Sequence, residues 1–156
     1  MRIKPLIVFA SLLSMTSPSA AQMVSAKDPR SVVAAMQARG YQAELGTEDG
    51  APRITSGAGG VKLTIFFGNC EKGANCTTVS FVTGFTHLNN VSLPRINDWN
   101  RQNRFARAYL DEEQDPMLVM DVDLDHQGIA SANFAEYLDI WSSLAPKYLE
   151  FLKKER

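Results

Sequence analysis

Hydrophobic residues recur with two different periods along the chain, and the changes between them predict its helices and strands. Helical spacing of three to four residues marks residues 29–39, 93–103 and 131–156. Alternation of apolar and polar residues marks residues 41–45, 53–55, 61–67, 77–85, 105–110 and 117–124. The sequence therefore predicts an α+β protein in the order α-β-β-β-β-α-β-β-α, and 156 residues suit a single domain.

Turn and capping residues punctuate the predicted helices. Asp28 and Pro29 supply an N-cap and a proline in the first turn, and Gly40 supplies a stop. We expect Ser92 to cap the central helix and Ser131 to cap the last one. Residue 146 of the last helix is a proline, which has no backbone N–H, so we expect that helix to be kinked or interrupted there.

Residues 93–110 are the most informative stretch. Ile96 and Trp99 form a narrow apolar stripe beside the polar Asn97 and Asn100, and from Phe105 the pattern switches to that of a strand. The two amides could orient a ligand, but we favour a structural role in which they satisfy backbone groups left open where the helix meets the strand. Trp99 lies on the apolar stripe, which favours a core anchor over a stacking platform.

Arginines are frequent in and after this helix. Arg101, Arg104 and Arg107 could bind an anionic partner, but the acidic run at residues 111–115 and Asp121 offer nearby carboxylates. We therefore expect these arginines to form surface ion pairs, which add little to stability.

The first 21 residues have the features of an export signal. Arg2 and Lys4 give a basic start, residues 6–15 are mostly apolar, Pro18 ends the run, and small residues precede Gln22. A membrane anchor is the alternative, but the apolar run has about ten residues where a spanning helix needs roughly 20. We therefore expect cleavage after residue 21, a mature domain of residues 22–156 with no membrane span, and a periplasmic or secreted protein.

Export changes the interpretation of the charge and of the cysteines. Residues 1–21 contain two basic and no acidic residues, so the mature chain would carry 14 basic and 17 acidic residues, a net charge of −3, which disfavours nucleic-acid binding. Cys70 and Cys76 flank a predicted hairpin loop, and an oxidising compartment favours a disulfide between them. A metal site is the alternative, but His87 is the only other ligand nearby.

Candidate catalytic and metal-binding patterns are weak. The glycines at 57–60 lack the lysine of a phosphate loop and lead into a strand, so they indicate a turn. Asp121, Asp123 and Asp125 alternate as in a calcium loop, but His126 stands where such a loop needs glycine. No serine or cysteine has a recognisable nucleophile setting. We therefore expect no catalytic residue, no metal and no cofactor.

The order of elements and several short motifs resemble the YbjN family. The resemblance covers nearly all of the mature chain and includes Phe66-Phe67 before the two cysteines and the segment 121–129 before the last helix. Its most specific part is the central motif, formed by Ile96, Asn97, Trp99, Asn100, Arg104 and Phe105. The resemblance implies a curved antiparallel sheet with helices against it, similar to type III secretion chaperones, and a description as a bacterial sensory transduction regulator.

The resemblance implies no catalytic residue, and the export signal departs from what a cytoplasmic regulator would carry. Our expectation is therefore a non-enzymatic binding or chaperone-like module outside the cytoplasm, with a protein as its partner. A homodimer is left open. The alternative is a small metal-binding protein or enzyme that uses Asp121, Asp123 and His126.

Overall fold

The computed structural model describes residues 22–86, 88 and 91–154, so the predicted signal peptide lies outside the described residues. Its three helices are α1 (Pro29–Ala38), α2 (Leu93–Gln102) and α3 (Ser131–Lys153). Its strands are β1 (Met23–Val24), β2 (Ala43–Glu48), β3 (Ala51–Ala58), β4 (Val61–Gly68), β5 (Thr78–Gly84), β6 (Arg107–Leu110), β7 (Pro116–Asp123) and β8 (Ile129–Ala130). The α+β class and the predicted order are confirmed, and the short strands β1 and β8 are additional.

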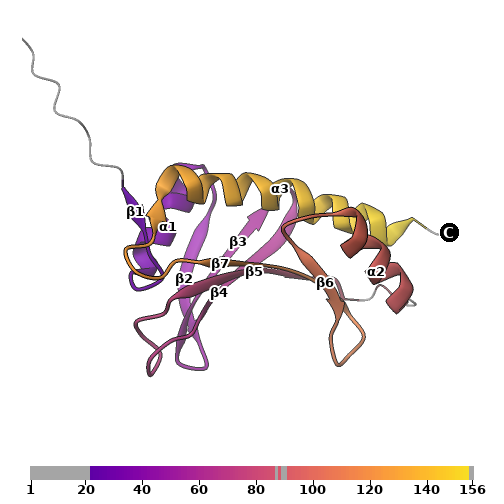
Figure 1. The fold of residues 1–156 in the computed structure, drawn as a ribbon, viewed down its shortest axis with the longest axis horizontal. Helices are drawn as coiled ribbons and strands as arrows, with labels where there is room; N and C mark the ends of the chain where they lie inside the picture. Colours follow the sequence, from indigo (N-terminus) through magenta and orange to yellow (C-terminus); the bar gives the residue numbers. More distant parts are fainter. Residues whose placement is uncertain (1–21, 87, 89–90, 155–156) are drawn as a thin grey trace, which may run out of the picture.

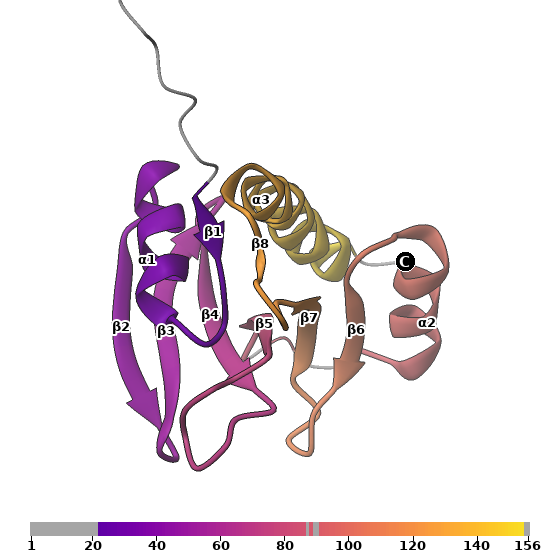
Figure 2. The ribbon, with the colours of Figure 1, turned by 60° about the vertical axis from the view of Figure 1, so that its left-hand side comes forward.

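Six strands form one antiparallel sheet in the order β2-β3-β4-β5-β7-β6. β1 and β8 pair separately, which joins the start of the described chain to the residues just before α3. α1 and α3 lie on one face of the sheet, and α2 lies at the end beside β6 (Figure 1, Figure 2). Both ends of the sheet bend away from α3, so the face without helices is concave (Figure 1).

Alternation along the strands decides which side chains reach the core. In β4, Val61, Leu63, Ile65 and Phe67 are buried, whereas Lys62 and Phe66 are exposed on the opposite face. A period of two places these two sets on opposite faces of the sheet, as the sequence predicts. The inward set packs against α1 and α3.

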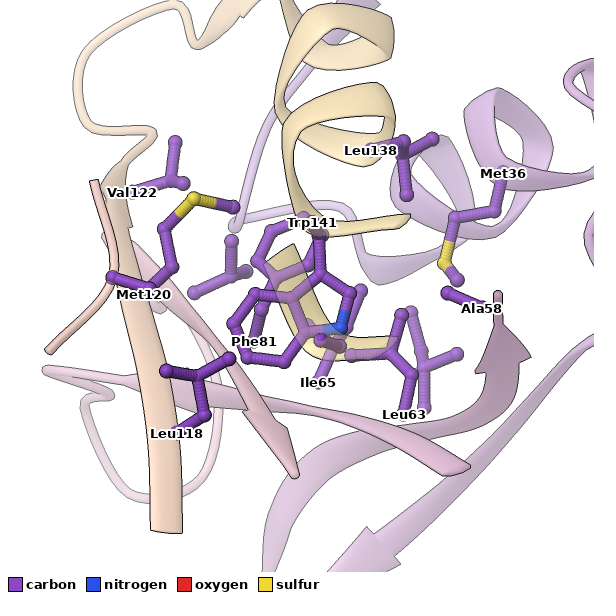
Figure 3. Packing of buried hydrophobic residues seen from close by; sticks show 14 of the residues in the cluster. Met36, Ala58, Leu63, Ile65, Phe81, Leu118, Met120, Val122, Leu138 and Trp141 are labelled. Atoms are coloured by element: carbon purple, nitrogen blue, oxygen red, sulfur yellow. The ribbon is translucent and has the colours of Figure 1, made fainter. Parts of the chain in front are cut away.

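The core lies between the sheet and α3, and Figure 3 shows its packing. Trp141 of α3 is fully buried, and its ring centroid lies 5.7 Å from that of Phe81 on β5. Phe134 lies on the same face of α3, about two turns before Trp141, and its ring centroid is 5.9 Å from that of Phe81. Burial of each such side chain contributes roughly 1.5–3 kcal/mol, so this layer is the main source of stability.

α3 runs unbroken through Pro146, and the predicted interruption is wrong. Proline at this position leaves the carbonyl of Ser142, four residues earlier, without its helical donor. The β3–β4 turn lies against that carbonyl, because a Cβ on Gly59 would come within 2.8 Å of the Ser142 oxygen. Packing against the turn therefore accompanies a helix that stays continuous across a position that would break an isolated one.

Cys70 and Cys76 form a disulfide, as the sequence predicts. The bridged loop follows β4 and lies against the β2–β3 turn, since a Cβ on Gly73 would come within 2.1 Å of the Gly50 carbonyl oxygen. The disulfide therefore closes a loop that contacts a second hairpin.

Helix ends match the sequence expectations only in part. The Asp28 side chain accepts a hydrogen bond from the Arg30 backbone at 3.1 Å, which confirms the cap of α1, and Gly40 follows its end with a φ of 82°. Ser92 stands at the N-cap of α2, as predicted, but its side chain makes no capping hydrogen bond. The N-cap of α3 is Ala130, so the prediction of Ser131 as its cap is wrong. The Ser131 backbone N–H instead donates to the Gln22 carbonyl at 2.8 Å, because β1 occupies this position.

Candidate functional site

The apolar half of the central motif fastens α2 to α3. Ile96 and Trp99 are buried, with 3% and 0% of their surface exposed. The Trp99 ring centroid lies 4.8 Å from that of Tyr148 and 5.4 Å from that of Phe151, both on α3. Arg95 adds to this contact, since its guanidinium donates to the carbonyl of Lys154 at 2.6 Å. These residues therefore position the rest of the motif rather than meet a ligand.

Asn100 closes the outer edge of the sheet. Its amide nitrogen donates to the Ala108 carbonyl at 3.0 Å, and its amide oxygen accepts from the Ala108 N–H at 2.7 Å. β6 is the edge strand, so these two backbone groups would otherwise face away from the sheet unpaired. The expected structural contact of Asn100 is thus present. Asn97 is exposed and shows no such contact in the described part of the chain, so the same expectation for Asn97 is wrong.

Replacement of Asn100 by Ala is expected to lower the free energy of unfolding by about 1–3 kcal/mol, because both backbone groups of Ala108 lose their partner. Asn97→Ala is the matched control on the same helix and should change it by less than about 0.5 kcal/mol. Urea unfolding followed by circular dichroism measures both. Equal stabilities of the two variants would contradict the edge-closing role of Asn100.

The remaining motif residues, Arg104 and Phe105, are exposed. Phe105 has 61% of its surface exposed and a φ of 73°, a backbone region that bulky residues rarely adopt. The predicted start of the strand at Phe105 is therefore wrong, and β6 begins at Arg107. Arg104 carries its guanidinium 5.4 Å from the Phe105 ring and shows no ion pair among the described residues. Together they line a groove against α3, made by segments that the sequence pattern does not connect.

A second hollow lies on the concave face of the sheet. Its volume is about 320 Å³, and its lining combines apolar side chains with charges of both signs. The lining residues are Lys62, Thr64, Phe66, Val82, Thr83, Gly84, Thr86, Asp111, Asp115 and Met117. Sequence alternation predicts which of these point away from the core, but it does not reveal that β5 pairs with β7, which brings them together.

Asp121 lies on the same open face in a small polar cluster. Ser80 donates to one carboxylate oxygen at 2.6 Å, and Arg107 binds the other. Partial burial by itself raises the pKa of Asp121, but the hydrogen bonds and charge of these partners outweigh it and hold the pKa below its usual value. Any stability from this cluster is present above the ordinary carboxyl pKa and is lost as the pH falls through the lowered one. The predicted pairing of Arg107 with Asp121 is confirmed, whereas Arg101 pairs with Asp98.

The residues proposed for metal binding do not converge. Asp121 is engaged by Ser80 and Arg107, and Asp123 accepts a hydrogen bond from the Asp125 backbone at 2.9 Å. His126 is exposed in the following turn. Within residues 22–86, 88 and 91–154, no group of three acidic, histidine or cysteine side chains could hold a metal ion. His87 lies outside the described residues.

Comparison with known proteins identifies the family. None of the curated proteins compared with the chain matches it. Among the described helices, none combines the length and hydrophobicity needed to span a bilayer. The model of the YbjN family, described as "Putative bacterial sensory transduction regulator", matches residues 28–154, which include all of α1, the six-stranded sheet, the central motif and α3. The chain therefore belongs to the YbjN family.

Proposed function

We propose that this protein is a non-enzymatic regulatory module that binds an extended segment of a partner protein outside the cytoplasm. Membership of the YbjN family supports a regulatory or binding module. The observation that carries the proposed mode of binding is the hollow on the concave face, which no helix covers (Figure 1).

The lining of this hollow suits a polypeptide better than a uniformly charged ligand. Phe66, Val82 and Met117 offer apolar contacts, Lys62 lies on one side, and Asp111 and Asp115 lie on the β6–β7 turn. Charges of both signs beside apolar surface match a segment that carries both kinds of side chain, whereas a nucleic acid needs a basic surface. An extended segment can lie along the strands of a sheet, and holding one is a chaperone-like activity.

The location is argued from the sequence and from the disulfide. The predicted export signal ends immediately before the first described residue, Gln22. The Cys70–Cys76 bridge suits an oxidising compartment. We therefore place the proposed partner in the periplasm or outside the cell, and N-terminal sequencing of the purified protein should begin at Gln22.

Partner capture with matched surface variants tests the proposal. Phe66 and Leu45 have 37% and 44% of their surface exposed, but Leu45 lies opposite the buried Ile54, on the face that the helices cover. A photo-crosslinking residue at position 64, inside the hollow, should capture a protein that mass spectrometry can identify. Adding Phe66→Asp should reduce capture by about tenfold or more, since it places a charge in an apolar contact, whereas Leu45→Asp should leave it unchanged.

Two results would contradict the proposal. Equal capture by both variants, with both melting like the wild type, would mean that the partner binds a surface other than the hollow. Calorimetric binding of calcium or zinc that Asp123→Ala abolishes would favour the metal-binding alternative instead.

A further inference from the structure

One side of α3, at the margin of the core, carries a stripe of exposed and half-buried residues. One helical face brings together Asn133, Glu136, Tyr137, Ile140, Ser143, Leu144 and Lys147. Beside it lie Arg104 and Phe105 on the connection from α2 to β6, which passes along α3 (Figure 1, Figure 2). Two open hollows of about 530 and 260 Å³ line up along this stripe, and Phe105 and Ile140 belong to both. They form one groove, centred on an apolar pair.

Charges divide the groove into two ends. Glu136 lies toward the start of α3, whereas Lys147 and Arg104 lie at the other end of the groove. In the described residues, neither Glu136 nor Arg104 belongs to an ion pair, and Lys147 contacts the Asn103 side-chain oxygen at 2.8 Å and the Trp99 ring rather than a carboxylate. Asp139, also in the groove, is already paired with Arg39. Glu136 acts on Arg39 only through its charge, and Lys147 and Arg104 contact an amide and aromatic rings, so neither end of the groove forms an ion pair within the described part of the chain.

We propose that this groove is the interface of a homodimer, in which two α3 helices pack antiparallel about a twofold axis near Ile140. In an antiparallel pair centred there, Lys147 of one copy lies opposite Asn133 of the other, within about one helical turn of Glu136. The basic end of one copy thus meets the acidic end of the other, twice in each dimer. A twofold axis requires this kind of self-complementary surface.

The apolar centre of the groove supports the same arrangement. Tyr137, Ile140 and Leu144 are half-buried in the single chain and would meet their own copies across the axis. Phe105, with 61% of its surface exposed in a backbone region that bulky residues avoid, would lie against the second α3. The inference concerns a different surface from the hollow on the concave sheet face, so each can fail without the other.

Sedimentation velocity tests the proposal on protein expressed from the full-length sequence and purified from the cell. The wild type should sediment as a dimer at micromolar concentrations. Glu136→Lys places lysines opposite lysines, and Lys147→Glu places acids opposite acids. The dissociation constant of the dimer should therefore rise by about tenfold or more in each single variant. An equimolar mixture of the two variants should dimerise again, because every opposing pair is then of opposite charge.

Restoration by mixing identifies the antiparallel interface even if Lys147→Glu lowers the melting temperature by itself. Phe105→Ser is a further variant, chosen because its exposed side chain can be removed with little effect on folding, and it should also favour the monomer. A wild type that stays monomeric at about 100 µM, where a weak dimer of micromolar affinity would be populated, overturns the proposal. Single variants that dimerise like the wild type overturn it too, since the dimer would then use another surface.

Discussion

Trp99→Ala is expected to lower the free energy of unfolding by about 3–5 kcal/mol, the loss typical of a large aromatic side chain removed from a core. Trp99 is fully buried, and its ring packs on Tyr148 and Phe151 of α3. α2 has only ten residues, too few to be stable alone, so it depends on this contact. Urea unfolding measured by tryptophan fluorescence and by circular dichroism would give the value, with Trp141 as the remaining fluorophore.

A second readout separates the undocking of α2 from a general loss of stability. The Ala108 N–H donates to Asn100 on α2, so undocking should expose this amide to hydrogen exchange before the central strands open. Leu93→Ala is the control on the same helix, because Leu93 is 64% exposed and its truncation should cost less than about 0.5 kcal/mol. A loss below about 1 kcal/mol for Trp99→Ala would mean that the Trp99 contacts do not hold α2 in place.

The parts of the fold that the sequence predicts well are those set by local periodicity. The alternation of Val61, Leu63 and Ile65 with polar residues places β4 and its buried face correctly, because a strand's two faces follow from a period of two. The cap at Asp28 was likewise predictable, because the bond joins residues only two apart. The disulfide followed from the position of both cysteines on one short loop.

Features that depend on distant segments were not predictable from one sequence. Pro146 signals a broken helix locally, but the turn at Gly59 packs against the affected carbonyl, and the helix continues. Ser131 suggests an N-cap, but the segment that leads into β1 takes up its backbone N–H from more than 100 residues away. In both cases a tertiary contact overrode a local preference.

In the central motif, too, some properties follow from local periodicity and others depend on distant segments. Helical spacing identified Ile96 and Trp99 as buried, but it could not distinguish Asn100 from Asn97, which has the same side chain three residues earlier. Only the position of the β6 edge decides that Asn100 has backbone partners. The groove beside Phe105 was also not predictable from the sequence, because more than half of its lining comes from α3.

Among the described glycines outside the disulfide loop, Gly128 is expected to tolerate replacement by alanine least. A Cβ at this position would lie 2.0 Å from the backbone carbonyl oxygen of Val24, and Gly128 has a φ of 78°. The colliding atom belongs to the backbone, so no side-chain rotation relieves the contact, and β1 must move away from β8. Backbone strain and overpacking together should lower the free energy of unfolding by about 2–5 kcal/mol.

Gly60→Ala separates these two contributions, because Gly60 also has a φ of 78° but a Cβ added there would meet no atom within 4 Å. Its free energy of unfolding should therefore fall only by the cost of an alanine in the left-handed backbone region, about 1–2 kcal/mol. The excess loss in Gly128→Ala measures how firmly β1 is held, and Val24 and Ala26, both fully buried, should become accessible to exchange in that variant alone. Equal losses in the two variants would mean that β1 yields without cost, and that the segment directly after the predicted cleavage site contributes nothing to the fold.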